Sequence, residues 1–162
     1  MKIIMEQWRS YLDEKRELFK KAKQIPYEFD WGLLNEQERN PRVATFDFDD
    51  TLRFSDTETA TPIVQAMKDL ISRGVEVYIV SSRRNDDENM EEVMAFVTDN
   101  NLPLSQEEVY LTNFADKLPT LKELGSEMHF ENDVEQVNTI NDSEENIKVM
   151  QVNPDTGTLI NF

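Results

Sequence analysis

The sequence contains no cysteine. That absence excludes disulfide bonds, thiolate zinc sites, iron–sulfur clusters and cysteine nucleophiles. Long hydrophobic runs are also missing, since every apolar run is far shorter than the roughly 20 residues that a membrane-spanning helix needs. The first ten residues lack the charged-then-apolar order of a signal peptide. We therefore expect a soluble, cytoplasmic protein that does not associate with membranes.

Positive charge is scarce as well. The chain has 17 basic against 33 acidic residues and a net charge of −16. Such a charge repels nucleic acid and acidic membrane surfaces at long range and favours cations. The composition therefore disfavours a nucleic-acid partner without excluding one. Residues 1–24 are the exception, because they hold seven basic and four acidic residues, a net +3 that leaves −19 for the rest.

The first 40 residues differ from the remainder of the chain. Apolar residues at helical spacing predict an amphipathic helix that ends before Pro26. We expect this helix to pack on the acidic body of the protein; the alternative is an arm that docks a partner or joins an oligomer. The segment that follows is expected to be irregular and anchored by Tyr27, Phe29, Trp31 and Leu33. The 162 residues then divide into this N-terminal part (1–40) and a single domain (41–162).

From Pro41 onward, strand-like and helix-like segments alternate. Runs rich in β-branched and aromatic residues predict the strands Arg42–Phe48, Val75–Val80, Val109–Leu111, Glu127–Phe130 and Ile147–Val152. Apolar stripes at helical spacing predict the helices Pro62–Arg73, Asp87–Asn100, Ala115–Leu124 and Val134–Ile140. Such alternation produces βαβ units. The predicted fold class is therefore α/β, a three-layer sandwich with a central parallel sheet.

Polar side chains gather where four of the predicted strands end. They are Asp47, Asp49 and Thr51 after the first strand, Ser81, Ser82 and Arg83 after the second, Lys117 in the helix after the third, and Glu131, Asn132 and Asp133 after the fourth. In open α/β sheets the ligand crevice lies outside the carboxyl ends of the strands, so we expect these groups to meet. Carboxylates, hydroxyls and a lysine in one crevice indicate a hard cation and an anionic substrate.

The spacing of Asp47 and Asp49 indicates a more specific chemistry. Residues two apart in an extended segment face the same side, and two neighbouring carboxylates need a cation to stay charged. Mg²⁺, which prefers oxygen ligands, can supply that charge. One aspartate can then act as a nucleophile and the other as a general acid and base. Lys117 would neutralise charge on a transferred phosphoryl group.

Four segments resemble the motifs of the haloacid dehalogenase (HAD) superfamily in their order and placement. VATFDFDDTL is similar to the first motif, DxDx(T/V) after a hydrophobic strand, and VYIVSSR to the second, a Ser or Thr at a strand end. Lys117 matches the lone lysine of the third motif, and MHFEND lies where the acidic fourth motif belongs. The resemblance spans about residues 41–153 and implies a Rossmann-like fold and a Mg²⁺-dependent phosphatase.

The resemblance also implies roles for individual residues. Asp47 would accept the phosphoryl group and bind Mg²⁺, and Asp49 would be the acid and base, with its backbone carbonyl on the metal. Ser81 would hold a phosphate oxygen, and Lys117 would bridge the phosphate and Asp47. The remaining candidates on the substrate side are Thr51, which resembles the threonine that steadies the motif loop, Ser82 and Arg83.

The fourth motif departs from the family pattern. The family has Asp-Asp, or Gly-Asp with a further Asp, whereas this chain has Glu131-Asn132 followed by Asp133. All three are candidate metal ligands. If Asn132 is a ligand, it offers a neutral oxygen in place of a carboxylate. Mg²⁺ binding should then be weaker unless Glu131 or Asp133 compensates.

The segments where HAD enzymes carry a cap domain are short in this chain. Ten residues separate Thr51 from Pro62 and 34 separate Ser82 from Lys117, fewer than the roughly 40 that an independent domain needs. The crevice is therefore expected to be open. We expect a phosphomonoesterase for a small or nucleotide-like phosphate. The alternatives are a phosphatase of polynucleotide ends, which the charge disfavours, and a catalytically degenerate binding protein, which Asn132 favours.

Overall fold

The computed structural model describes residues 6–14 and 29–160, apart from the side chain of Leu33. The strands are β1 (Val43–Phe46), β2 (Glu76–Ser81), β3 (Val109–Leu111), β4 (Met128–Glu131) and β5 (Lys148–Gln151). The helices are α2 (Ile63–Ser72), α3 (Asp87–Asp99), α4 (Leu118–Leu124) and α5 (Val134–Asn141), with short 3₁₀ turns η1 (Trp31–Leu33) and η2 (Gln106–Glu108). Strands and helices alternate as the sequence predicts.

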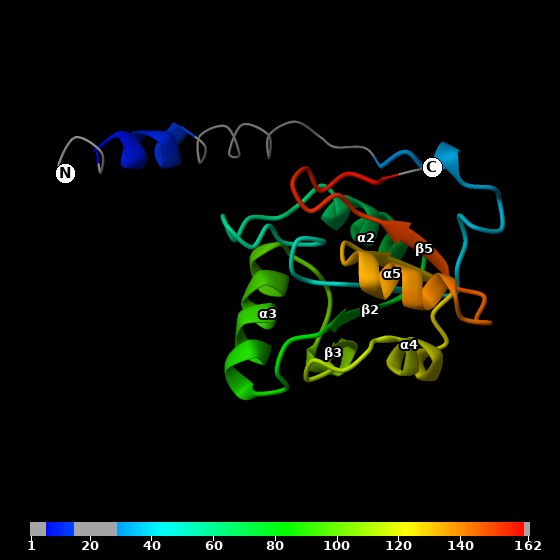
Figure 1. Ribbon diagram of the computed structural model, residues 1–162. Coiled ribbons are helices and arrows are strands. Elements are labelled where there is room, and N and C mark those ends of the chain that lie inside the picture. Colours follow the sequence, from blue (N-terminus) through cyan, green and yellow to red (C-terminus); the bar gives the residue numbers. More distant parts are fainter. Residues whose placement is uncertain (1–5, 15–28, 161–162) are drawn as a thin grey trace.

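The five strands form one parallel sheet in the order β3-β2-β1-β4-β5. β1 is central, with Phe46 beside Ile79 of β2 and Phe130 of β4. Because parallel crossovers are right-handed, α2 and α3 cover one face and α4 and α5 the other. In Figure 1, α5 lies in front of the strands and α2 behind them. The prediction of a three-layer α/β fold is therefore confirmed.

Alternating side chains of the strands fill a core on each face of the sheet. On the α2 and α3 face, Phe46 joins a large buried cluster and stacks on Phe130 with ring centroids 4.4 Å apart. On the opposite face, Val80 packs against Leu121 of α4 and Ile140 of α5. The two cores hold the sheet rigidly between the helices, so that the loops at its edges start from fixed points.

Local sequence signals account for the bounds of the helices. The side chain of Asp86 accepts a hydrogen bond from the Asn89 N–H at the start of α3, at 2.9 Å. Gly125, with φ of 71°, ends α4 in the left-handed conformation that favours glycine. α4 begins at Leu118 instead of the predicted Ala115, because Ala115 closes a turn in which its N–H donates to the Thr112 carbonyl at 3.1 Å.

The segment before β1 is attached to the body by aromatic contacts. Phe29 is buried, and its ring lies 6.1 Å from Phe130 and 4.5 Å from Trp31. This confirms the anchoring that was predicted for Phe29 and Trp31, whereas Tyr27 and the side chain of Leu33 lie outside the described residues. Leu34, which the sequence analysis did not single out, is buried beside them.

The predicted N-terminal helix is described only in part. Residues 6–14 are helical, and all nine are exposed. Trp8 is 57% exposed, and its ring contacts Tyr11 at 5.6 Å between centroids. These nine residues therefore do not show the expected packing of the helix on the acidic body (Figure 1). Pro26 lies outside the described residues.

Candidate active site

A tight loop leaves the carboxyl end of β1 and carries the first predicted motif. The Asp47 N–H still donates to the Phe130 carbonyl of β4, at 2.9 Å, which fixes Asp47 to the edge of the sheet. The loop then turns back, so that Leu52 N–H and Arg53 N–H both donate to the Phe48 carbonyl at 3.0 and 3.1 Å. Phe48 itself is fully buried. The aspartates therefore start from a well-anchored backbone.

Lys117 brings two carboxylates together at this edge. Its Nζ lies 2.6 Å from Asp47 Oδ1 and 2.7 Å from Glu131 Oε2. All three side chains are buried, with 1% of Lys117 and 5% of Asp47 exposed. Lys117 lies just before α4, and the other two residues lie at the ends of β1 and β4. A buried ammonium between two carboxylates is stable only because both charges partner it.

The proximity of the charges shifts all three pKa values. Burial, followed by the negative charge of Glu131, raises the pKa of Asp47 to about 7 against the opposing effect of Lys117. Burial also acts to raise the pKa of Glu131, but the hydrogen bond from His129 and the charge of Lys117 outweigh it and hold this pKa at about 2. Burial acts to lower the pKa of Lys117, yet the two carboxylates outweigh it and raise the pKa. At neutral pH, Lys117 and Glu131 are therefore charged, and Asp47 is near its midpoint.

The second oxygen of Asp47 faces Thr51 and Asn132. The Thr51 hydroxyl donates to Asp47 Oδ2 at 3.1 Å, and Thr51 is fully buried. The Asn132 amide has two orientations that exchange its nitrogen and oxygen. With the nitrogen inward, it donates to Asp47 Oδ2 at 2.7 Å, to the Asp49 carbonyl at 3.1 Å and to Thr51 Oγ1 at 3.2 Å. With the oxygen inward, Asn132 accepts from Thr51 at 3.2 Å and meets two other oxygens.

This inward-oxygen orientation matches the donor set that Mg²⁺ prefers. Three oxygens then face one another: Asp47 Oδ2, the Asp49 carbonyl and Asn132 Oδ1, the last lying 2.7 and 3.1 Å from the other two. Neighbouring ligands of an octahedral Mg²⁺ are about 2.9 Å apart, given Mg–O distances near 2.1 Å. Among the described residues, no three His, Cys, Asp or Glu side chains are grouped to hold a metal. A magnesium site here would therefore depend on one carboxylate, one amide and one backbone carbonyl.

Asp49 points away from Lys117 and toward two arginines. Arg83 binds it through both oxygens, with Nε 2.7 Å from Oδ2 and Nη2 2.8 Å from Oδ1. Arg53 Nη2 lies 3.3 Å from the same Oδ1, and Glu92 pairs with Arg83 on the other side. Burial acts to raise the pKa of Asp49, but the hydrogen bond and charge of Arg83 outweigh it and lower the pKa. The Asp49 carboxyl is therefore ionised in this arrangement.

The two serines of the second motif stand at the end of β2. Ser81 is buried, and its Oγ accepts from the Arg83 N–H at 3.4 Å. Ser82 is exposed, and its carbonyl accepts from the Phe114 N–H at 2.8 Å. The loop after β3 is thereby tied to the loop after β2. Both serines thus lie at the carboxyl edge that also carries the aspartates.

Glu131 and Asp133, which the sequence predicts as metal ligands, have protein partners in the structure. Glu131 Oε2 accepts from Lys117, and Oε1 accepts from the Asp133 N–H at 3.1 Å. The Asp133 side chain accepts from the Glu135 N–H at 2.9 Å and caps α5. Glu131 is therefore the partner of the lysine, and Asp133 is a helix cap. Of the fourth motif, Asn132 is the residue whose side chain lies within hydrogen-bond distance of Asp47.

Two polar residues near the site were not among the predicted site residues. Arg53 is buried and contacts Asp49. His129, whose place inside a predicted strand indicates a structural role, is fully buried beside Glu131. A signal for the histidine exists, because a polar residue in the middle of a buried strand requires a buried partner. The sequence offers no comparable signal for Arg53, whose contacts arise from the turn of the loop.

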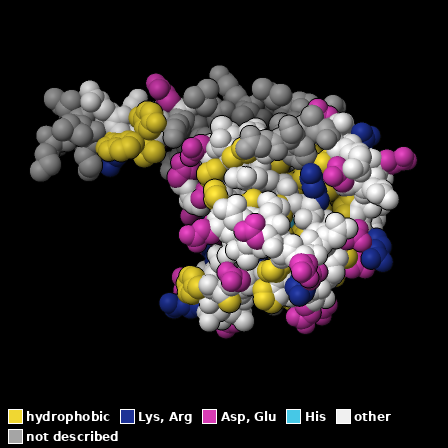
Figure 2. All heavy atoms as spheres, turned by 45° about the vertical axis from the view of Figure 1, so that its right-hand side comes forward, with side chains coloured by type: hydrophobic (Ala, Val, Ile, Leu, Met, Phe, Trp, Pro, Cys, Tyr) yellow, Lys and Arg dark blue, Asp and Glu magenta, His cyan; other side chains and the backbone are white. Residues whose placement is uncertain are grey.

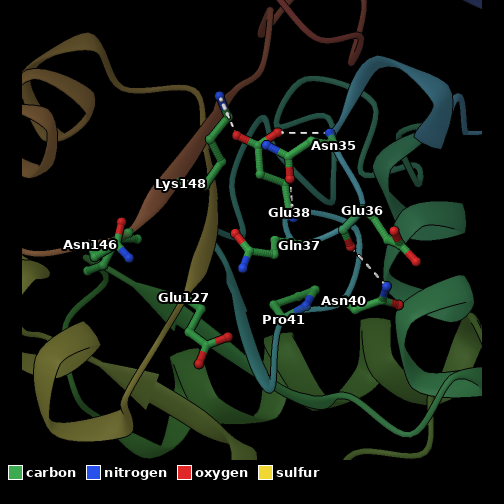
Figure 3. A pocket seen from close by; sticks show the side chains of 10 residues that line it. Asn35, Glu36, Gln37, Glu38, Asn40, Pro41, Glu127, Asn146 and Lys148 are labelled. Atoms are coloured by element: carbon green, nitrogen blue, oxygen red, sulfur yellow. Dashed lines mark hydrogen bonds and ion pairs between the residues drawn. The ribbon is translucent and has the colours of Figure 1, made fainter.

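A hollow of about 970 Å³ lies at the opposite edge of the sheet. It is lined by polar residues of the 35–41 segment and by residues that precede or begin β4 and β5, including Glu127 and Lys148. Glu38 in this hollow accepts from the Asn35 N–H at 3.1 Å and lies 3.6 Å from Lys148 (Figure 3). Its groups partner one another, and it is remote from the carboxyl ends of the strands. The candidate active site therefore lies elsewhere.

Comparisons with known proteins do not identify a family for this chain. No protein-family model and no curated protein matches the chain. Among solved structures, the chain is similar to the hypothetical protein PH1952 from Pyrococcus horikoshii OT3, with 16% sequence identity and a TM-score of 0.36. The similarity covers 70% of this chain and 42% of that one, so this chain spans less than half of that protein's length. No helix among the described residues is long and apolar enough to span a bilayer.

Proposed function

We propose that this protein is a Mg²⁺-dependent phosphomonoesterase of the kind that its HAD-like motifs indicate. One observation carries the proposal. Asp47 and Lys117 are 70 residues apart in the sequence, yet they lie 2.6 Å apart, buried, at the carboxyl edge of a parallel sheet. A carboxylate held against an ammonium at this edge suits the capture of a phosphoryl group.

The reaction proceeds in two displacements. Asp47 attacks the phosphorus of the substrate, the bond between phosphorus and the ester oxygen breaks, and Asp49 donates a proton to the departing oxygen. Water then attacks the aspartyl-phosphate, Asp49 takes the proton of that water, and the bond from phosphorus to Asp47 breaks. The alcohol and inorganic phosphate are released. The Lys117 ammonium, 2.6 Å from Asp47, neutralises charge near the transferred group.

The oxygens that would hold Mg²⁺ are Asp47 Oδ2, the Asp49 carbonyl and Asn132 Oδ1. The ion would supply positive charge beside the phosphoryl oxygens. Glu131 and Asp133 are left out of this set, because their oxygens bind Lys117 and cap α5.

Asp49 needs a proton before it can act as the acid. In the structure Arg83 binds both of its oxygens, at 2.7 and 2.8 Å. We therefore assign to Arg83 an exchange of partners, in which its guanidinium moves from Asp49 to the substrate phosphate. The released carboxyl regains its proton affinity. Binding of the anionic substrate by Arg83 would thus lead to protonation of Asp49.

We infer the substrate class from the length of the segments between the motifs and from charge. The ten residues after Thr51 and the 34 after Ser82 are too few for an independent cap domain. The net charge of −16 provides no electrostatic track for a polynucleotide backbone. A small or nucleotide-like phosphomonoester therefore fits the site better than a polynucleotide end.

The test is hydrolysis of p-nitrophenyl phosphate with Mg²⁺ by the wild type and two variants. Asp47→Asn removes the nucleophile and should reduce turnover to the uncatalysed background. Asp50→Asn is the matched control, because Asp50 is the adjacent aspartate, its carboxyl accepts from the Ser55 N–H at 2.8 Å, and asparagine tolerates its φ of 57°. Turnover by Asp47→Asn equal to that of the control would refute the mechanism.

Asn132 favours a second candidate, a binding protein without turnover. As an amide it donates to Asp47 Oδ2 at 2.7 Å and so occupies the nucleophile in the absence of a cation. In this case the wild type would neither bind Mg²⁺ in a calorimetric titration nor hydrolyse the aryl phosphate, and Asn132→Asp would gain Mg²⁺ binding. Measurable Mg²⁺ binding and turnover by the wild type would exclude this candidate.

A further inference from the structure

A chain of buried polar groups runs beneath the proposed nucleophile, on the sheet face that α4 and α5 cover. Thr45 of β1 and His129 of β4 are neighbours in the register of the sheet, and Ser126 precedes β4. Thr45 and His129 are 0% exposed and Ser126 is 6% exposed. Buried polar groups are unfavourable unless they are hydrogen-bonded, so their partners define what they do.

These partners form one continuous path. Thr45 Oγ1 lies 2.8 Å from Ser126 Oγ and 2.8 Å from His129 Nδ1. His129 Nε2 lies 3.0 Å from Glu131 Oε2. That same oxygen accepts from Lys117 Nζ at 2.7 Å. The path therefore ends at the lysine that contacts Asp47.

The chemistry of the partners fixes the direction of the hydrogen bonds. Glu131 is ionised, so His129 Nε2 must carry the hydrogen that it shares with Oε2. Nδ1 is then an acceptor, and the Thr45 hydroxyl donates to it. Burial lowers the pKa of His129, in keeping with a neutral ring. Thr45 Oγ1 is left to accept from the Ser126 hydroxyl, which also lies 3.0 Å from the Met128 carbonyl.

We propose that His129 is a positioning residue for the proposed reaction. Its Nε2–H holds Glu131 Oε2, the oxygen that contacts Lys117, while the Asp133 N–H holds Oε1 at 3.1 Å. Without the bond from His129, Oε2 keeps Lys117 as its only partner, so this oxygen and the ammonium can shift together away from Asp47. Small displacements of this kind cost large factors in rate. The catalytic part of this inference rests on the phosphatase proposal, and the positioning part does not.

The first test compares two substitutions of His129. His129→Phe keeps a planar ring and removes both nitrogens, whereas His129→Gln keeps a donor for Glu131. With p-nitrophenyl phosphate, we expect His129→Phe to lower kcat by about 10- to 100-fold at nearly unchanged KM, and His129→Gln to recover most of the loss. Ile140→Ala is the control for a purely structural defect, because Ile140 is buried on the same sheet face and its loss should lower stability without changing kcat. Equal kcat for folded His129→Phe and wild type would overturn the inference, as would a His129→Gln variant no better than His129→Phe.

The second test does not need turnover. The chain has a single histidine, so its ring signals in a ¹H–¹⁵N correlation spectrum require no assignment. We expect the neutral tautomer with the hydrogen on Nε2, and a slowly exchanging Lys117 ammonium signal that His129→Phe removes and His129→Gln retains. Thr45→Val should preserve the ammonium signal and change the Nδ1 shift, which keeps the test available if His129→Phe fails to fold. A ring with its hydrogen on Nδ1, or an ammonium signal indifferent to residue 129, would overturn the inference. Absence of turnover in the wild type together with the expected spectra would refute the phosphatase proposal alone.

Discussion

At the scale of single residues, the carboxyl group of Asp47 differs most in its surroundings from an aspartate in water. It is buried beside Glu131, and its pKa rises to about 7 despite the contact with Lys117. At neutral pH this carboxyl group is about half protonated. A cation beside it would favour the ionised form, which the proposed reaction needs.

The first prediction concerns the stability of the metal-free protein. The folded pKa of Asp47, about 7, lies above the ordinary value of 3.8, so the folded state binds the proton more tightly. The resulting stabilisation is full below about pH 4 and is lost as the pH rises through 7. The free energy of unfolding, measured with urea, should therefore decrease by on the order of a few kcal/mol between pH 4 and pH 7. Asp47→Asn should abolish this decrease.

Glu131 provides an internal contrast to this behaviour. The pKa of Glu131 is lowered from 4.5 to about 2. Its contribution to the free energy of unfolding is therefore fully present above pH 4.5 and is lost only as the pH falls through 2. The decrease above pH 4.5 is thus specific to Asp47. Asp50→Asn serves as the control and should keep the wild-type slope. An equal decrease in stability in Asp47→Asn would contradict the assignment, because burial lowers the pKa of His129 and that group contributes only a rise in stability with pH. Mg²⁺ should also flatten the slope, because it favours the ionised carboxylate.

The second prediction concerns Asp49. Arg83 is the group that lowers its pKa against the effect of burial, so Arg83→Met should raise the pKa of Asp49 in the metal-free protein. The measurement is a ¹³C NMR titration of the carboxyl signals. Arg84→Met is a matched control, because Arg84 is exposed and faces Asp86 at 4.0 Å. A pKa of Asp49 that responds equally to both variants would contradict the ion pair.

At the scale of elements, the parallel sheet brings the site together. β1, β2 and β4 are adjacent and end at the same edge, so three loops and the start of α4 converge there. Helix starts also determine which acids are available. Asp133 begins α5 and binds the Glu135 N–H, which directs its carboxylate toward the helix backbone and away from Asp47.

The third prediction follows from this helix cap. Asp133→Ala should lower the free energy of unfolding by about 1 kcal/mol, because α5 loses its N-cap, and should leave Mg²⁺ affinity unchanged. Asn132→Ala should weaken Mg²⁺ binding and leave the N-cap of α5 intact, since the Asn132 side chain lies within hydrogen-bond distance of Asp47. Calorimetric titration and urea unfolding of both variants distinguish the roles. Loss of Mg²⁺ binding in Asp133→Ala would restore Asp133 as a ligand.

At the scale of the whole molecule, negative charge is spread widely. Figure 2 shows acidic side chains over the visible face of the body, with few basic ones among them. The basic side chains at the site, Arg53, Arg83 and Lys117, are already paired with carboxylates. The described residues of the body therefore offer little positive surface to a polyanion.

The fourth prediction tests this distribution of charge. Short single-stranded oligonucleotides should show no binding at 50 mM salt in fluorescence anisotropy, since a nucleic-acid-binding protein gains most of its affinity from phosphate contacts at low salt. Inorganic phosphate in the presence of Mg²⁺ should compete with the aryl phosphate under the same conditions. Oligonucleotide binding that weakens steeply with salt would instead favour the polynucleotide-end phosphatase.

The regular elements were predictable because their signals are local. The largely apolar run VEVYIV and the apolar stripe of α2 place both elements within a residue or two of their bounds. Parallel pairing then follows from the alternation of elements, and it brings Asp47 and Lys117 to one edge. The partners of Asp49, by contrast, were not predictable. Arg53 and Arg83 contact Asp49 from a turn and a loop, and the periodicity of apolar residues does not predict the geometry of either.

The sequence by itself determined the α/β class, the order of the elements and the polar residues delivered to the carboxyl edge, because periodicity and strand order act along the chain. Only the tertiary structure decided which partner each of those residues has. Glu131 contacts Lys117 and His129, Asp133 accepts from the backbone of α5, and Asn132 contacts Asp47. The physical reason is that each side chain bonds to the polar groups that lie within its reach, and the packing of the elements decides which groups those are.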